Sequence, residues 1–351
     1  MIFGIELEVL WFVLVAVLFA GYFLLEGFDF GIGMLLPILG KDERRRSAII
    51  TTIGPVWDGN EVWLIVAGGA MFAAFPEWYA TMFSGLYLGL FGIILALIFR
   101  AVALEWRSKV NTDRWRRWCD AGIIAGSVAT PLIWGIAISS MLAGLPLDSE
   151  QRLSSGAGTL VHFVHPYSLL GGVAFTLVFL LHGLAFLRLK TTGTLREEAA
   201  RLTPIVGGLA AVAGAAFVLW TQIAHGKDWT WAVAALALVG VLGGIAALAG
   251  HRDGIAFTAT SIATLAVTAL IFGSMYPNLM PSSVDPAFSL TIHNGASSEY
   301  TLTILTWTAA VITPLVILYQ GWTYWVFSKR ISADPVALGA PASTEGSPEK
   351  A

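Results

Sequence analysis

Charge is scarce in this sequence of 351 residues. Only 12% of the residues are Asp, Glu, Lys or Arg, whereas 56% are apolar. Soluble domains carry about 25% charged residues, so a soluble globular protein is excluded. The composition is typical of a polytopic membrane protein, whose lipid-facing surface accepts apolar side chains.

Cysteine is almost absent as well, since Cys119 is the only one. One cysteine cannot form an internal disulfide and cannot ligate a metal cluster alone. A phosphate-binding loop is also missing, because no glycine-rich segment is followed by Lys-Ser or Lys-Thr.

Apolar runs of about 20 residues, each long enough to cross a bilayer, dominate the rest of the chain. They predict an all-α protein with nine transmembrane helices and with its termini on opposite sides of the membrane. The first run carries acids and has no small-residue cleavage site, so we expect a retained helix and not a signal peptide. The predicted spans are 9–36, 51–74, 79–99, 119–142, 160–187, 204–224, 230–249, 256–275 and 301–327.

The basic residues are distributed very unevenly among the connections. Eighteen of the 20 Lys and Arg residues follow odd-numbered spans, and only Arg152 and Lys227 lie on the other side. Cytoplasmic loops of membrane proteins are enriched in Lys and Arg. The pattern therefore predicts an outer N-terminus and a cytoplasmic C-terminus.

No linker divides the membrane-spanning part, so residues 1–331 are predicted to form one transmembrane domain. Residues 332–351 are small, polar and rich in proline. Such a composition predicts a disordered cytoplasmic tail.

Four carboxyl groups lie inside the first two spans: Glu26 and Asp29 in one, Asp58 and Glu61 in the other. Each pair is spaced i, i+3, which places both members on one helix face. A charged group at membrane depth costs roughly 2.5–3.5 kcal/mol on insertion scales, and such groups often form proton paths. At 1.5 Å per residue, Asp58 is predicted roughly 10 Å, Asp29 roughly 12 Å and Glu26 roughly 16 Å from the cytoplasmic end.

Structural hydrogen bonding is the alternative interpretation of these acids. Neither of the first two spans contains Lys or Arg, and Arg100 at the end of the third is the nearby candidate for an ion pair. Asp29 and Glu61 fit a structural role better than the other two acids, since each is close to small residues and Asn60 offers a partner.

Histidine and tryptophan give weaker signals. His162, His165 and His182 in the fifth span could ligate haem only if a second ligand lay at a matching depth on a facing helix. A packing or helix-capping role explains His165 equally well, because Pro166 follows it. Trp57, next to Asp58, could stack on a quinone ring or simply pack.

Three segments together resemble subunit II of the cytochrome bd-type quinol oxidases. They are residues 25–33, residues 54–76 with Trp57-Asp58-Gly-Asn60-Glu61-Val-Trp63, and the pair Phe99-Arg100. The match is densest over residues 20–110, and the spans and loop charges fit the whole chain except the tail.

The resemblance implies two four-helix bundles plus a peripheral ninth helix. It implies a bacterial cell-membrane complex with subunit I, which carries two haems b and one haem d and oxidises quinol while reducing dioxygen to water. It further implies lipids, a bound quinone and small accessory subunits as partners. It does not imply binding of nucleic acid.

The same resemblance assigns roles to individual residues. Asp58 matches the acid at the entrance of a proton path. Glu26 matches a position that is often Asp in relatives, and Trp57 matches the aromatic residue that contacts a quinone. Glu61 stands where the family has Gln, which adds a titratable group. The path is therefore expected to comprise Asp58, Glu26, Asp29 and Glu61, with no catalytic residue or metal ligand in this chain.

Two other classes of protein compete with this interpretation. A stand-alone transporter with an acid-lined path would show discontinuous or repeated helices around a midplane site, and the sequence shows neither. A haem-ligating electron carrier is disfavoured by the placement of the histidines.

Overall fold

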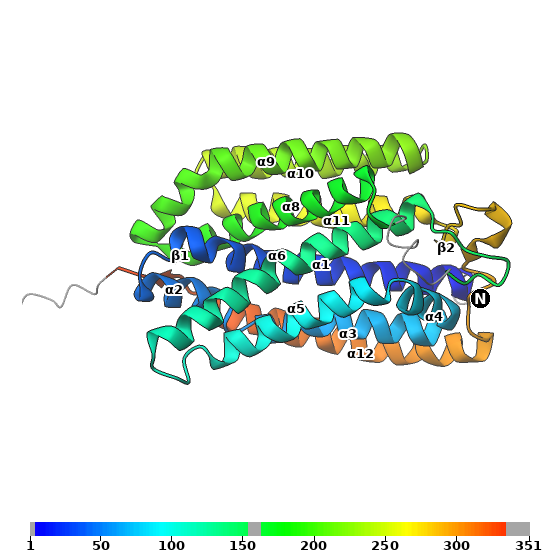
Figure 1. Ribbon diagram of the computed structural model, residues 1–351, viewed down its shortest axis with the longest axis horizontal. Helices are drawn as coiled ribbons and strands as arrows, with labels where there is room; N and C mark the ends of the chain where they lie inside the picture. The colour runs from blue at the N-terminus through cyan, green and yellow to red at the C-terminus, as the bar shows by residue number, and fades with distance from the viewer. Residues whose placement is uncertain (1–3, 154–162, 335–351) are drawn as a thin grey trace, which may run out of the picture.

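The computed structural model describes residues 4–153 and 163–334, and long helices dominate this part of the chain (Figure 1). Eight helices are long and apolar enough to cross a membrane. The ninth, α3, has 18 residues, or ~27 Å at 1.5 Å per residue; it is less apolar because Asp58, Asn60 and Glu61 occupy its first turns. These features confirm an all-α polytopic membrane protein. The nine helices are α1 (Leu7–Leu39), α3 (Trp57–Ala74), α5 (Tyr87–Trp106), α6 (Asp113–Ala143), α8 (Pro166–Lys190), α9 (Gly193–His225), α10 (Thr230–Ala249), α11 (Asp253–Met275) and α12 (Glu299–Val326).

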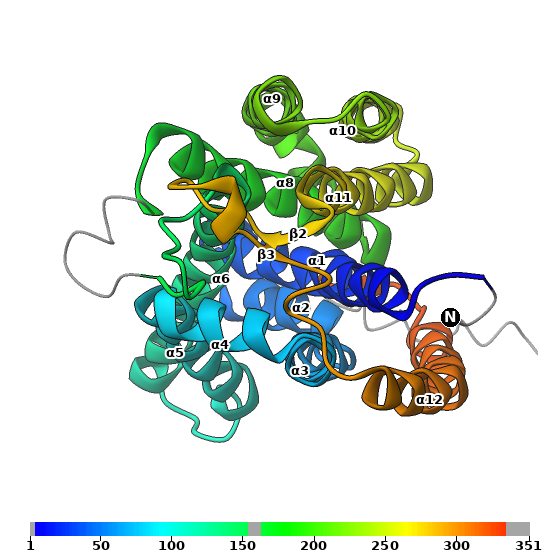
Figure 2. The ribbon, with the colours of Figure 1, turned by 90° about the vertical axis from the view of Figure 1, so that its right-hand side faces the viewer.

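The long helices form two groups of four, seen end-on in Figure 2. One group contains α1, α3, α5 and α6, and the other contains α8, α9, α10 and α11; α1 and α6 pack against α8 and join them. Helix α12 lies outside both groups, against α3 and α1, and only Leu302 on it is buried. The predicted division into two bundles and a peripheral ninth helix is thereby confirmed.

The second predicted span, 51–74, is not one helix. A short helix, α2 (Glu43–Ile53), ends before a turn at residues 54–56, and α3 then begins at Trp57. Pro55 lacks a backbone N–H and cannot continue a helix in its interior. As a result Asp58 lies in the first turn of α3, and a continuous helix from residue 51 was the wrong basis for its predicted depth.

The third predicted span, 79–99, is also displaced. Helix α4 (Pro76–Gly85) is short, and the spanning helix α5 begins after Leu86 and continues to Trp106. Arg100 is therefore not at the end of the span. It lies six residues before the last residue of α5, about 9 Å inside the helix at 1.5 Å per residue.

Helices α1 and α8 approach so closely that only glycine fits between them. A Cβ atom on Gly31 would lie 2.2 Å from the carbonyl oxygen of Phe179 and 2.6 Å from the Cα atom of Gly183. Small residues at such positions let neighbouring membrane helices approach closely. This contact fixes α1, and with it Glu26 and Asp29, in the middle of the molecule.

The two ends of the molecule differ in structure. At what we call the basic end, on the left of Figure 1, α2 lies beside the end of α8, and a two-residue parallel pair joins β1 (Thr191–Thr192) to β4 (Ile331–Ser332). The chain is described as far as Asp334, whose carboxylate accepts hydrogen bonds from the hydroxyl and N–H of Thr194. At the opposite end β2 (Asn278–Met280) pairs antiparallel with β3 (Leu290–Thr291), which follows a 3₁₀ turn (Pro286–Phe288).

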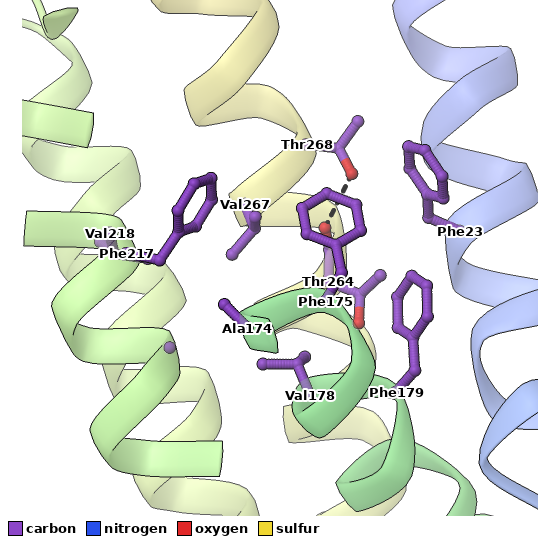
Figure 3. A pocket seen from close by; sticks show the side chains of 11 residues that line it. Phe23, Ala174, Phe175, Val178, Phe179, Phe217, Val218, Thr264, Val267 and Thr268 are labelled. Carbon is purple, nitrogen blue, oxygen red and sulfur yellow. Dashed lines mark hydrogen bonds between the residues drawn. The ribbon is translucent and has the colours of Figure 1, made fainter. Parts of the chain in front are cut away.

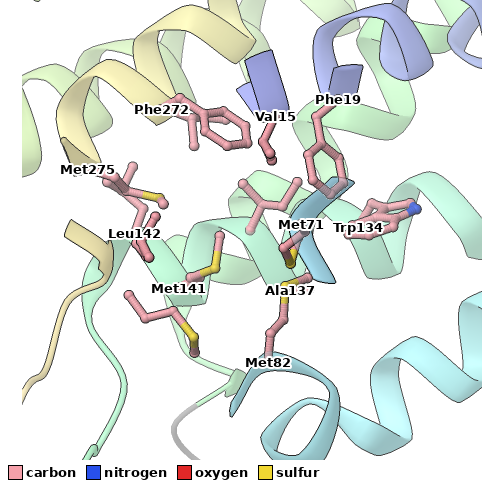
Figure 4. Packing of buried hydrophobic residues seen from close by; sticks show 14 of the residues in the cluster. Val15, Phe19, Met71, Met82, Trp134, Ala137, Met141, Leu142, Phe272 and Met275 are labelled. Atoms are coloured by element: carbon pink, nitrogen blue, oxygen red, sulfur yellow. The ribbon is translucent and has the colours of Figure 1, made fainter. Parts of the chain in front are cut away.

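An aromatic and methionine-rich core, built by side chains of both bundles, fills the half of the molecule away from the basic end (Figure 4). The rings of Phe19 and Trp134 meet edge to face, with centroids 5.8 Å apart. This core bounds the polar site described next.

Candidate functional site: a buried acid–arginine cluster

Arg100 of α5 lies at the centre of a buried polar cluster. Its Nη1 donates to Glu26 Oε2 at 3.0 Å and to Glu61 Oε1 at 2.8 Å. Arg100 and Glu26 have fully buried side chains, and that of Glu61 is 19% exposed. The guanidinium carbon also lies 4.8 Å from the centre of the Phe30 ring. Arg100 is thus paired with two of the intramembrane acids, Glu26 and Glu61.

Asp29, one turn further along α1, is held by an amide. Its Oδ2 accepts a 2.7 Å hydrogen bond from Asn60 Nδ2. The Asn60 carbonyl oxygen in turn accepts from Tyr324 at 2.8 Å and from Gln320 at 3.2 Å, both on α12. We call Glu26, Asp29, Asn60, Glu61 and Arg100 the acid–arginine cluster.

Three helices position this cluster for simple geometric reasons. The i, i+3 spacing on α1 aims Glu26 and Asp29 to one side. The break at residues 54–56 starts α3 where Asn60 faces Asp29 of α1 and Glu61 faces Arg100 of α5. The extension of α5 to Trp106 brings Arg100 inside the bundle to the level of Glu26.

The charges of the cluster do not balance. One guanidinium faces three carboxyl groups, those of Glu26, Asp29 and Glu61. Buried charge is costly unless it is paired and hydrogen-bonded. Glu26 Oε1 and Asp29 Oδ1 are nevertheless buried without a hydrogen-bond partner among the residues that the structure describes.

Asp58 lies outside the cluster, on an open groove. It is exposed in the first turn of α3 and makes no hydrogen bond or ion pair with another described residue. The groove of about 450 Å³ between α3 and α12 is lined by Asp58, Asn60 and Trp63 together with residues of α12. Asn60 thus touches the groove on one side and Asp29 on the other.

A second groove reaches the cluster from the opposite face of α3. It measures about 580 Å³, runs between α3, α4 and α5, and is largely apolar. Glu61 lines it together with Phe19 and Trp134. The cluster therefore separates two grooves, and a carboxyl group lines each of them.

Comparison with known proteins decides the family. The family model for cytochrome bd terminal oxidase subunit II matches residues 7–327. The chain belongs to this family. It is 38% identical to cytochrome bd ubiquinol oxidase subunit 2 of Bacillus subtilis over 93% of this chain and 97% of that protein. It is 34% identical to cytochrome bd-I ubiquinol oxidase subunit 2 of Escherichia coli over 94% and 96%.

The fold agrees with this assignment. The bd oxidase structure from Geobacillus thermodenitrificans matches with a TM-score of 0.75 and 20% sequence identity, over 93% of this chain and 100% of that chain. The chain is thus subunit II of a bd-type quinol oxidase, a bacterial multi-pass membrane protein in an oxidoreductase complex with catalysis in subunit I. The family also places haem in that complex.

Two histidines considered as haem ligands serve structural roles in subunit II. His182 is fully buried, with Nδ1 2.8 Å from the Thr260 hydroxyl and Nε2 3.1 Å from the Leu24 carbonyl. His165 caps α8 in a reciprocal pair with Ser168, and partial burial lowers the pKa of its imidazole. His162 lies outside the described residues. Within the described residues no group of three or more His, Cys, Asp or Glu side chains could hold a metal ion.

Trp57 begins α3 and is half-buried. It packs against the apolar core near the basic end and is not among the residues that line the two grooves. Its predicted contact with a quinone stays a prediction.

Gln320 and Tyr324 are members of the site that the sequence did not predict. Both bind Asn60, and Gln320 Oε1 also accepts a 2.7 Å hydrogen bond from Trp63 Nε1. Their i, i+4 spacing on an otherwise apolar helix was the available signal, because it forms a short polar stripe.

Proposed function

We propose that subunit II conducts protons from the basic end of the molecule to the acid–arginine cluster, for use by subunit I in reducing dioxygen to water with electrons from quinol. The observation that carries this proposal is the excess of buried carboxyl groups over the single guanidinium. With Glu26, Asp29 and Glu61 all ionised, the cluster would bear a net charge of −2 (one guanidinium against three carboxylates).

Such a charge is unfavourable in a site this deeply buried. The cluster becomes neutral when two of its three carboxyl groups hold a proton. Carboxyl groups that share protons in this way can accept a proton on one side and release it on another, which is what a proton path requires.

The geometry supports a definite order of residues. Asp58 takes up protons in the α3–α12 groove, where solvent reaches it. Asn60 lines the same groove and holds Asp29, and Glu26 follows on the same face of α1. Arg100 then links Glu26 to Glu61. Amide groups do not titrate, so Asn60 orients Asp29, while the transfer itself passes between carboxyl groups through water.

The proposed direction depends on the orientation in the membrane. The described connections at the basic end hold most of the Lys and Arg residues, among them Arg44, Arg107 and Arg116, and a basic end of this kind favours the cytoplasm. With the C-terminus inside and the N-terminus outside, Asp58 draws protons from the cytoplasm.

We further propose that two haems b and one haem d are bound by subunit I, which supplies the electron transfer and oxygen chemistry. The hydrogen bonds of both His182 ring nitrogens within this chain support that division. A quinone bound against subunit II would find an apolar surface at Trp57 or in the α3–α5 groove. Lipids and small accessory subunits would cover further apolar surface, such as that of α12.

A stand-alone transporter fits the structure less well. Helices do break, between α2 and α3 and between α4 and α5, but both breaks lie near the ends of the bundle (Figure 1). A midplane substrate site between broken helices is the arrangement expected of such a transporter.

Amide substitutions in the purified complex test the proposal. Asp58→Asn and Glu26→Gln keep shape and hydrogen bonding but remove the titrating group, so oxygen reduction per haem should slow, at least as much for Glu26→Gln as for Asp58→Asn. Glu26→Asp keeps the acid and should be milder. Glu105→Gln, in an exposed pair with Lys109, is the matched control. Unchanged turnover of both amide variants across about pH 6 to 9 would show that these acids are structural.

A further inference from the structure

Helix α6 carries buried hydroxyl groups that its own backbone does not satisfy. Ser127 and Thr130 are fully buried, and neither hydroxyl has a hydrogen-bond partner among the described residues. Other helical hydroxyls donate to the carbonyl four residues earlier: Ser140 to Ile136, and Thr268 to Thr264 at 3.0 Å (Figure 3). The unpaired pair on α6 is therefore a local departure from the usual arrangement.

Pro131 adds an acceptor at the same turn. Because proline has no N–H, the carbonyl of Ser127 cannot receive the usual i+4 hydrogen bond. One turn of α6 thus presents this carbonyl and the hydroxyls of Ser127 and Thr130. Freed backbone groups of this kind inside membranes are satisfied by side chains or by ordered water.

This turn lies against the acid–arginine cluster. A Cβ atom on Gly33 would be 2.0 Å from Ser127 Oγ, and one on Gly126 would be 2.7 Å from the Cβ atom of Arg100. The guanidinium offers Nε and Nη2, and Glu26 offers Oε1, all buried and without a partner in the described chain. Donors and acceptors of the cluster therefore adjoin those of α6.

The polar groups continue away from the basic end. Trp134 follows Thr130 by one turn on α6, and Tyr22 precedes Glu26 by one turn on α1; their rings are 6.2 Å apart. Trp134 Nε1 and the Tyr22 hydroxyl are buried close to each other, and neither has a hydrogen-bond partner of good geometry in the part of the chain that is described. Figure 4 shows Trp134 at the edge of the apolar core. From Ser127 to Trp134 the row spans about 10 Å at 1.5 Å per residue.

We propose that these groups bind a short chain of ordered water molecules between Arg100 and Tyr22. We name the site the α6 water column, comprising Ser127, Thr130 and Trp134 with Tyr22, Glu26 and Arg100. Buried water molecules each make about three hydrogen bonds to otherwise unsatisfied polar groups. Arg100 and Trp134 supply donors, Glu26 and the Ser127 carbonyl supply acceptors, and the hydroxyls act as either.

The column deepens the proposed proton uptake, on which its functional meaning rests. It gives Glu26 a hydrated connection that leads away from Asp58, toward the half of the bundle beyond the cluster. Protons arriving at Glu26 are then accepted by water on its far side, while the acid returns to its starting state.

A map of the assembled oxidase at a resolution that shows ordered water tests the site directly. Density for water is expected within hydrogen-bonding distance of Thr130 Oγ1 and of Arg100 Nε or Nη2. The proposal would be overturned if the side chains of α1, α5 and α6 pack against one another at this turn and leave no room for water.

Hydroxyl deletions test its function. Thr130→Val and the double variant Ser127→Ala/Thr130→Val keep nearly the same shape, and we expect oxygen reduction per haem to fall by about threefold to tenfold in the double variant, as loss of one or two net hydrogen bonds would give. The solvent hydrogen-isotope effect should also rise. Thr268→Val is the matched control, since its buried hydroxyl is satisfied by its own helix.

The outcomes separate the column from the path. If Glu26→Gln slows turnover while the double hydroxyl variant equals the control in rate and isotope effect, the column is refuted and the path stands. If neither slows turnover, both are refuted.

Discussion

Arg100 is the residue on which the charge balance of the buried site depends. Its single Nη1 atom joins Glu26 on α1 to Glu61 on α3, and its side chain is fully buried. Removing one partner of a buried ion pair typically costs about 3–5 kcal/mol, because the remaining charge is left uncompensated. The guanidinium is therefore expected to be needed for assembly of the complex.

We therefore expect Arg100→Gln to lower the thermal stability of the purified complex by about 3 kcal/mol or to prevent its assembly. Adding Glu61→Gln to it should recover part of the loss, because one unpaired carboxyl is then removed. Haem content and the unfolding midpoint are the measurements. Equal midpoints for the unmodified and Arg100→Gln complexes would contradict the charge argument.

His182 gives a second prediction at this scale. Its two ring nitrogens are hydrogen-bonded to Thr260 and Leu24, and its ring stacks on Phe257 at 4.8 Å. His182→Ala should destabilise the α8–α11 contact but leave the haem absorption bands of the assembled complex unchanged in position. Loss of one specific haem band would instead make His182 a ligand, and the same measurement applies to His162 and His165.

Some of these residue contacts could be predicted and others could not. Arg100 was predictable because no other basic residue lies near four acids in an apolar stretch. The contacts of Asn60 with Gln320 and Tyr324 join residues about 260 positions apart. No periodicity within one helix contains information about such a pairing.

At the scale of helices, a charge network fixes the basic end of the first bundle. Arg107, just after α5, donates to both carboxylate oxygens of Glu43 on α2, at 2.7 and 2.9 Å, and to Asp120 on α6 at 2.6 Å. These hydrogen bonds raise the pKa of Arg107 and lower the pKa of Glu43. Three helices are thereby joined where the predicted proton entry begins.

Arg107→Ala should lower the free energy of unfolding by about 2 kcal/mol, since the buried Asp120 would keep only its 3.0 Å ion pair with Arg46. Lys109→Ala is the control, because its pair with Glu105 is more than half exposed and contributes little. Thermal denaturation of the purified complexes compares the two. Similar losses in both variants would show that the network adds no stability.

The pKa shift of Glu43 has a defined pH dependence. Because hydrogen bonds from Arg107 hold the pKa of this carboxyl below its ordinary value of 4.5, its contribution is fully present above that pH and is lost as the pH falls through the lowered value. The stability difference between the unmodified and Glu43→Gln complexes should be constant from neutral pH to about 4.5 and shrink on further acidification. A difference that grows with acidification would have the wrong sign.

Helix number and type were predictable from hydropathy, whereas two helix boundaries were not. Proline and glycine are tolerated inside membrane helices when neighbours satisfy the freed groups. Gly54-Pro55 was therefore compatible with a continuous span as well as with the observed break. The break before α5 follows Gly85 at the end of α4. A Cβ atom on Gly85 would lie 2.1 Å from the side chain of Leu153. Because Leu153 is far from Gly85 in the sequence, the local sequence could not predict this contact.

For the whole molecule, the basic end should face the cytoplasm. Single cysteines at Arg44, Asn111 and Glu197, all exposed at that end, should resist impermeant thiol reagents in intact cells. A cysteine at the exposed Glu150 of the opposite end should react, and the native Cys119 is buried. Labelling of any of the first three cysteines from outside would show that the topology, and with it the direction of proton entry, is the reverse of the one proposed.

The central claim is that Glu26 carries protons to the oxygen-reducing partner subunit. Its most direct test is proton uptake by the purified, fully reduced complex during a single reaction with dioxygen, followed with a pH indicator and compared with haem oxidation. In Glu26→Gln, proton uptake should be delayed relative to the unmodified complex and to Glu105→Gln, while the first electron transfer to oxygen keeps its rate. Uptake that is equally fast and equally complete in the Glu26→Gln complex would contradict the account.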